Sequence, residues 1–166
     1  MGRGFNSGKP WIGSWDWCSY QIGQCRLHIN KVQTAQYYST LPMITDNCKC
    51  DYCKHFQYEV INRPNMLFKL LKNMHVDISR QPKDPNIEVC CIGEAKPGKL
   101  GYMGSYLAYG IVGKTSKSTA SKDNEGQVKE VTFNNVEFGK NMHVSITQID
   151  TDKISFSFYI ETDANL

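Results

Sequence analysis

The chain has 166 residues, of which 40% are hydrophobic and 21% are charged, with a formal net charge of +3. This length is that of a single domain, and this balance excludes a disordered chain. The charge is well below that of a dedicated nucleic-acid-binding protein, so composition alone selects no partner. Seven residues are cysteines, an odd number that cannot pair completely within one chain. This count favours a reducing compartment and predicts a cytoplasmic location.

The first 23 residues predict an N-terminal arm ahead of a single domain at residues 24–166. The arm lacks the apolar run of a secretory signal, and no segment of the sequence reaches the roughly 18 apolar residues of a membrane span. We therefore expect no membrane partner. All three tryptophans, Trp11, Trp15 and Trp17, lie in the arm. Either the arm is irregular and packs across the core, or its tryptophans bind a partner protein.

The first half of the domain predicts one strand followed by two helices. Apolar and polar residues alternate over residues 25–32, which indicates a half-buried strand. After a loop around Pro42, helical spacing begins at residue 51 and continues to residue 62, with Asp51 as the expected N-cap. A second helix follows Pro64, and its expected buried stripe comprises Met66, Leu67, Leu70, Leu71 and Met74.

The second half of the domain predicts a sheet. The nearly continuous apolar run at residues 87–93 indicates a central strand, with residues 102–112 as its hairpin partner. A mobile polar loop is expected at residues 113–126, and short strands at 128–133 and 136–138. Residues 143–150 and 154–161 alternate most clearly. We therefore predict an α+β domain with an antiparallel sheet of about 5–7 strands, covered on one face by a helical pair at about residues 51–75.

Three cysteines form the motif that carries the most chemistry. Cys48, Cys50 and Cys53 have the spacing CxCxxC at the start of the first predicted helix. Such spacing brings three sulfurs onto one turn, and zinc prefers four ligands in a tetrahedron. The candidates for a fourth ligand are Cys91 or Cys90 on the predicted central strand, His55, His75, Cys18 and Cys25. Of these we place Cys91 first, with Cys90 as the alternative if the helices cover the other strand face.

The same cysteines have two other interpretations. Reduced cysteines serve as small apolar residues in protein cores, without any metal. Cys50 and Cys53 also resemble the CxxC pair of thioredoxin-like oxidoreductases, in which a helix N-terminus favours the reactive thiolate. Those enzymes place CxxC directly after a buried strand. The polar segment at residues 42–47 does not predict such a strand.

Other motifs have weaker support. Residues 108–115 match a relaxed phosphate-binding loop pattern, but the match lies in a predicted strand and no helical stripe follows it. The four histidines are scattered, and no catalytic arrangement follows from their spacing. Lys114, Lys117 and Lys122 could contact nucleic acid, although a solvated loop is the simpler interpretation. These observations lean against an enzyme and leave the question open.

The order of features resembles a group of small bacterial proteins without a settled biochemical role. In that group a strand leads to Cys-x-Cys-x-x-Cys-x-x-Phe on a helix, followed by an amphipathic helix ending near Val/Ile-Asp and then by an antiparallel sheet. The matching residues here are Cys48, Cys50, Cys53, Phe56, Val76, Asp77, Glu88, Val89 and Cys90. The resemblance covers about residues 24–162 and implies an α+β fold and a bacterial cytoplasmic protein.

From the absence of a catalytic set and the aromatic arm, we predict a non-enzymatic, cytoplasmic module that binds another protein, as an immunity protein binds its toxin. The first alternative is a nucleic-acid-binding or regulatory module stabilised by one structural zinc ion. The second is a thiol oxidoreductase that uses Cys50 and Cys53.

Overall fold

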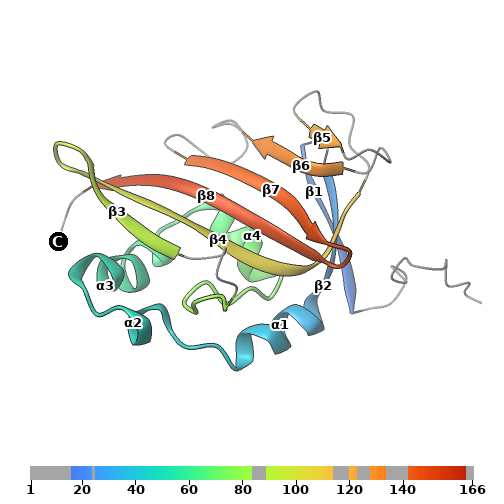
Figure 1. The fold of residues 1–166 in the computed structure, drawn as a ribbon, viewed down its shortest axis with the longest axis horizontal. Coiled ribbons are helices and arrows are strands. Elements are labelled where there is room, and N and C mark those ends of the chain that lie inside the picture. Colours follow the sequence, from blue (N-terminus) through green and yellow to red (C-terminus); the bar gives the residue numbers. More distant parts are fainter. Residues whose placement is uncertain are drawn as a thin grey trace, which may run out of the picture.

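The computed structural model describes residues 16–23, 25–83, 89–113, 120–122, 128–133 and 142–163, without the side chains of 89–92, 120–122 and 128–133. In these residues eight strands form one sheet, every strand pair is antiparallel, and the helices lie on one face (Figure 1). The predicted α+β class is confirmed. The strands are β1 (Trp17–Ile22), β2 (Cys25–Asn30), β3 (Val89–Lys96), β4 (Lys99–Val112), β5 (Ala120–Lys122), β6 (Val128–Phe133), β7 (Met142–Asp150) and β8 (Lys153–Asp163).

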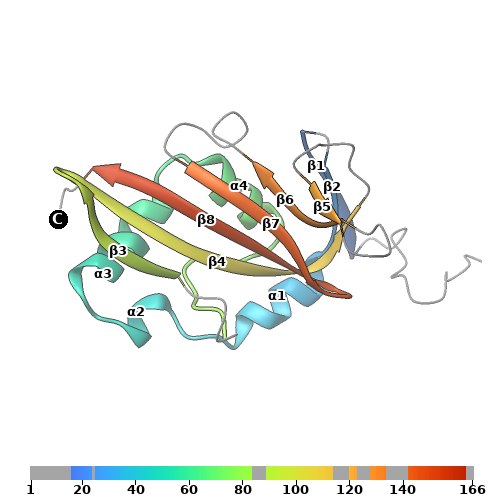
Figure 2. The same ribbon diagram turned by 45° about the horizontal axis from the view of Figure 1, so that its top comes forward.

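The helical layer is larger than the predicted pair. Its members are α1 (Lys31–Ser39), α2 (Ile44–Asn47), α3 (Asp51–Tyr58), the 3-10 helix η1 (Val60–Asn62) and α4 (Met66–Asn73). The turned view shows these helices on the same side of the sheet (Figure 2). Within the described residues, no helix combines the length and the apolar character that crossing a membrane requires.

Strand β4 organises the sheet, whose order is β1-β2-β4-β8-β7-β6-β5, with β3 also paired to β4. Along one edge β4 pairs with β8 over residues 99–109. Along its other edge it pairs first with β3, over residues 99–104, and then with β2, over residues 110–112. The prediction of a central strand at residues 87–93 is therefore wrong, because β3 pairs with β4 and with no other described strand. A continuous apolar pattern does not distinguish a central strand from an edge strand that a helix covers.

Between the parts of β4 that pair with β3 and with β2, no described strand pairs with this edge, and side chains of helix α1 take the place of a strand there. The Leu107 amide donates a hydrogen bond to the Tyr38 hydroxyl oxygen over 3.0 Å, and that hydroxyl donates to the Leu107 carbonyl over 2.8 Å. The Tyr109 amide donates to Thr34 Oγ1 over 3.0 Å. Thr34 and Tyr38 are the buried residues of α1. Because only one threonine and one tyrosine of α1 are buried, the helix has no apolar stripe by which its sequence could predict it.

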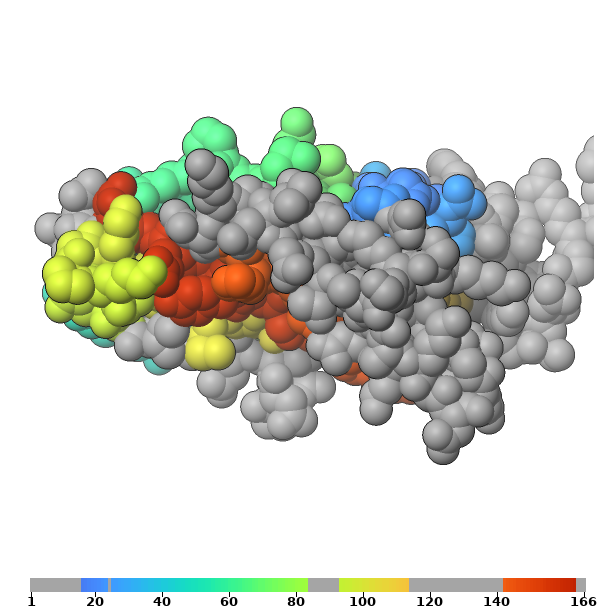
Figure 3. Space-filling model, turned by 90° about the horizontal axis from the view of Figure 1, so that it is seen from above, coloured from blue at the N-terminus to red at the C-terminus, as the bar shows by residue number. Residues whose placement is uncertain are grey.

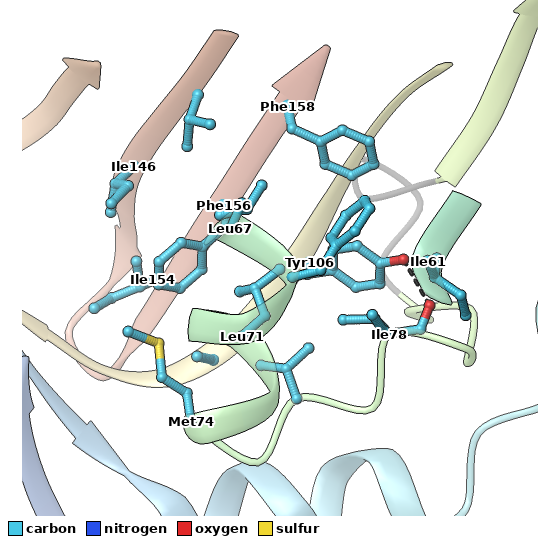
Figure 4. Close-up of a cluster of buried hydrophobic side chains, with 14 of the residues drawn as sticks. Ile61, Leu67, Leu71, Met74, Ile78, Tyr106, Ile146, Ile154, Phe156 and Phe158 are labelled. Atoms are coloured by element: carbon cyan, nitrogen blue, oxygen red, sulfur yellow. Dashed lines mark hydrogen bonds between the residues drawn. The ribbon is translucent and has the colours of Figure 1, made fainter. Parts of the chain in front are cut away.

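The core lies between the helices and the inner face of β4, β7 and β8. Residues of α4 point at the sheet residues in Figure 4, which also shows the Tyr106 hydroxyl donating to the Ile78 carbonyl over 2.6 Å. The buried members drawn there include Leu67, Leu71, Met74, Ile146, Ile154, Phe156 and Phe158. Of the predicted α4 stripe, Leu67, Leu71 and Met74 are buried and Leu70 is half-buried, whereas Met66 is 60% exposed.

Two segments expected to be irregular contribute strands. Residues 17–22 of the predicted arm form β1, which pairs with β2 from Trp17 opposite Asn30 to Ile22 opposite Cys25. Within the predicted polar loop at 113–126, residues 120–122 form β5, which pairs with β6. The other residues of that loop after Gly113, the predicted strand at 136–138, and Trp11 and Trp15 lie outside the described residues.

We expect Tyr38→Phe to destabilise the protein by about 1–3 kcal/mol, because it removes the hydroxyl that pairs with both buried backbone groups of Leu107. Urea unfolding followed by far-UV circular dichroism measures this free energy. Tyr58→Phe is the control, since Tyr58 is 59% exposed and its hydroxyl has no partner among the described residues. An equal loss in both variants would contradict the role assigned to Tyr38.

Candidate metal centre

The CxCxxC motif lies at the junction of α2 and α3. Cys48 follows α2 as its C-cap, and the Cys48 amide donates to the Ile44 carbonyl over 3.2 Å. Cys50 is the N-cap of α3, and its Sγ accepts a hydrogen bond from the Cys53 amide over 3.4 Å. The expected N-cap, Asp51, is instead the first residue of the helix. An N-cap side chain reaches the third helical residue, so this capping geometry brings the sulfurs of Cys50 and Cys53 to one side of the first turn.

The three sulfurs converge. The Sγ atoms of Cys48 and Cys50 are 3.3 Å apart, and all three Sγ atoms lie within 4.8 Å of one another. In a tetrahedral site with zinc–sulfur bonds of about 2.3 Å, neighbouring sulfurs are about 3.8 Å apart. The Cys48–Cys50 separation is shorter than this value, and 4.8 Å is the upper limit for the other two separations. Among the described residues, this is the one group of histidine, cysteine or acidic side chains close enough together to hold a metal ion.

The local environment distinguishes the three thiols. The Cys53 amide and then the Cys48 thiol donate hydrogen bonds to Cys50, which lowers the pKa of the Cys50 thiol. Burial, followed by hydrogen bonding to Cys48, raises the pKa of the Cys53 thiol. Cys48 and Cys50 are exposed, whereas Cys53 is buried. The thiolate therefore forms more readily at Cys50, on the side open to solvent, than at Cys53, whose deprotonation a bound cation would favour.

The predicted fourth ligands, Cys91 and its alternative Cys90, have side chains outside the described residues. Their backbone positions are defined by β3. Cys91 is opposite Tyr102 on β4, and Cys90 is opposite Met103. Tyr102 is fully buried, whereas Met103 is 44% exposed. Helix α3 lies below β3 in both ribbon views (Figures 1 and 2).

The other candidates for a fourth ligand do not join the sulfur cluster. Cys18 is on β1 and Cys25 on β2, at the opposite end of the sheet from α3 (Figure 1). His75 is exposed and follows α4. His55 is on α3 but is buried, and its Nδ1 lies 2.7 Å from the Tyr102 hydroxyl.

The buried pair of His55 and Tyr102 was missed by the sequence analysis. Burial lowers the pKa of His55, which favours the neutral imidazole. Its Nε2 is buried without a hydrogen-bond partner among the described residues. No local pattern could have found this pair, because the two residues are 47 positions apart and meet through the packing of α3 on β4.

The backbone before the cysteines differs from that of a thioredoxin-like enzyme. Helix α2 and three non-helical residues precede α3, where such enzymes have a buried strand leading into the CxxC helix. Residues 44–47 are thus helical, and they do not form a strand that leads into α3.

Comparison with known proteins does not assign the chain to a family. No protein-family model, no curated protein and no solved structure matches the chain. The resemblance to small bacterial proteins therefore stays a prediction, and functional inference depends on the site itself.

In the reduced, metal-free protein we expect iodoacetamide to alkylate Cys50 first and Cys53 slowest, because thiolate character and exposure both favour Cys50. Proteolysis and mass spectrometry at successive times give the rate at each cysteine, with half-buried Cys18 as an internal reference. The ranking should disappear in denaturant. Equal native rates at Cys50 and Cys53 would contradict it.

Proposed function

We propose that the chain is a zinc-binding module in which Cys48, Cys50 and Cys53 hold one structural zinc ion. The observation that carries this proposal is the convergence of three sulfurs within 4.8 Å at the α2–α3 junction. An all-thiolate set suits zinc better than magnesium, calcium or manganese, which prefer oxygen ligands. Zinc has no redox chemistry of its own, so a zinc ion in this cluster would have a structural role.

Cys91 is our proposed fourth ligand. In β3 the backbone of Cys91 is opposite Tyr102, and the backbone of Cys90 is opposite Met103. Tyr102, opposite Cys91, packs against α3, since its hydroxyl donates to the Tyr52 carbonyl over 3.3 Å. Met103, opposite Cys90, is half-exposed. The register thus supports Cys91 over Cys90, and the metal would link the α2–α3 junction to edge strand β3.

The proposed zinc ion would have a structural role, because the two helices that it would join, α2 and α3, are short. Helix α2 has four residues and α3 has eight, lengths at which helices are marginal on their own. Residues 48–50 between them are exposed. A zinc ion would fix this junction directly. The exposed Lys49 and Lys54 would offset part of the negative charge of the thiolates.

We expect about one zinc ion per chain in protein purified without a histidine tag, as structural sites bind one ion through four ligands. Elemental mass spectrometry measures the metal, and cobalt(II) substitution should give the absorption bands of a tetrahedral thiolate site. Chelation should lower the melting temperature, because the metal stabilises the α2–α3 junction.

Cysteine-to-serine variants assign the ligands. Cys48→Ser, Cys50→Ser, Cys53→Ser and Cys91→Ser should each lose zinc, whereas Cys90→Ser and Cys18→Ser should keep it. If Cys90→Ser loses the metal and Cys91→Ser keeps it, the assignment of Cys91 as the fourth ligand is wrong, whereas the proposed zinc site itself stands. Protein that takes up no zinc on refolding in its presence, with all of its thiols remaining titratable, would overturn the proposed function.

A further inference from the structure

We propose that a groove between α4 and the end of β8 binds an acidic peptide segment of a partner protein. The groove has a volume of about 910 Å³ and is formed by η1, the start and outer side of α4, the first residues of β4 and β7, and the C-terminal end of β8. Figure 3 views this side, where the green helical segment lies beside the red end of β8. The groove does not use the cysteine cluster, so this proposal goes beyond zinc binding.

The base of the groove is apolar. Ile61, Phe68 and Met142 line it and are almost fully buried, and Ile160 is half-buried beside them. Met66 lies on the rim with 60% of its surface exposed. The apolar surface open to a ligand therefore comes mainly from Met66 and Ile160, above this buried floor. Apolar surface with polar groups around it is the usual composition of a protein-binding site.

The rim carries positive charge that the described residues do not neutralise. Lys69 and Lys72 line the groove and form no ion pair within the described part of the chain. Arg63, also in the lining, is near enough to Asp163 to help lower the pKa of that carboxyl. Lys69 and Lys72 are three positions apart on α4 and therefore project to the same side of the helix. Two unpaired lysines beside exposed apolar side chains favour a ligand that combines carboxylates with an aliphatic side chain.

The acidic residues of the groove are already paired. Lys99 Nζ lies 2.5 Å from Asp163 Oδ1, and Lys96 Nζ lies 3.3 Å from Glu161 Oε2. Hydrogen bonds from these lysines lower the pKa values of Asp163 and Glu161, so both remain ionised. The charge left for a ligand is therefore the positive charge at the α4 end.

The lining favours a peptide over nucleic acid. Single-stranded nucleic acid is held by exposed aromatic rings on which bases stack. The one aromatic side chain among the described lining residues is Phe68, which is 1% exposed.

Selection of random phage-displayed peptides on the immobilised, purified full chain tests the proposal. We expect the selected peptides to combine aspartate or glutamate with leucine, isoleucine or methionine. Synthetic versions would then be measured by fluorescence anisotropy. The double variant K69Q/K72Q should weaken binding by roughly tenfold or more, because it removes two unpaired rim charges.

The matched control is K31Q/K83Q, which removes the same charge from two residues outside the groove lining. It should bind as the wild type does, and circular dichroism should show both variants folded. Neutral or basic selected peptides, no selected peptides, or equal weakening in the two variants would overturn the proposal. Tighter binding of a twenty-base oligothymidylate than of the best peptide, lost in K69Q/K72Q, would overturn it in favour of nucleic acid.

Discussion

The structure depends on satisfying both edges of one long strand. Strand β4 has 14 residues, and β8 pairs with most of one edge. The other edge is divided between β3, the side chains of Tyr38 and Thr34, and β2. An unpaired backbone group buried there would cost about as much as a lost hydrogen bond. Helix α1 must therefore lie against this edge, and it continues directly from β2, which pairs with the same strand.

The same constraint positions both proposed sites. Strand β3 occupies the first part of the β4 edge, and its register brings Cys91 opposite Tyr102. Tyr102 contacts α3 through His55 and the Tyr52 carbonyl, which holds the cysteine-bearing turn near β3. Helices η1 and α4 continue from α3 and cover the inner face of β8 as far as its end, where the groove lies. One helical segment thus carries the cysteine cluster at its start and the groove at its end.

Much of the fold could be predicted because its signals are periodic and local. Strands β7 and β8 alternate along their length, and α4 has an apolar stripe, so both kinds of element were expected. Helix α1 was not, since its buried residues are a threonine and a tyrosine whose hydroxyls replace strand partners. The order of strands was also out of reach, because an apolar run is compatible with a central strand and with a covered edge strand. The N-cap at Cys50 was missed because cysteine is not among the preferred capping residues.

The sequence by itself determined what short-range chain geometry controls. Three cysteines within six residues meet because one capped helical turn leaves little choice for their sulfurs, and the alternating strands specify an inner and an outer face. Only the tertiary structure decided the contacts between distant residues, such as Tyr38 with Leu107, 69 positions apart, and His55 with Tyr102, 47 positions apart. Such contacts depend on which strands pair and in what register. That choice is made by the packing of the whole domain, and no local pattern encodes it.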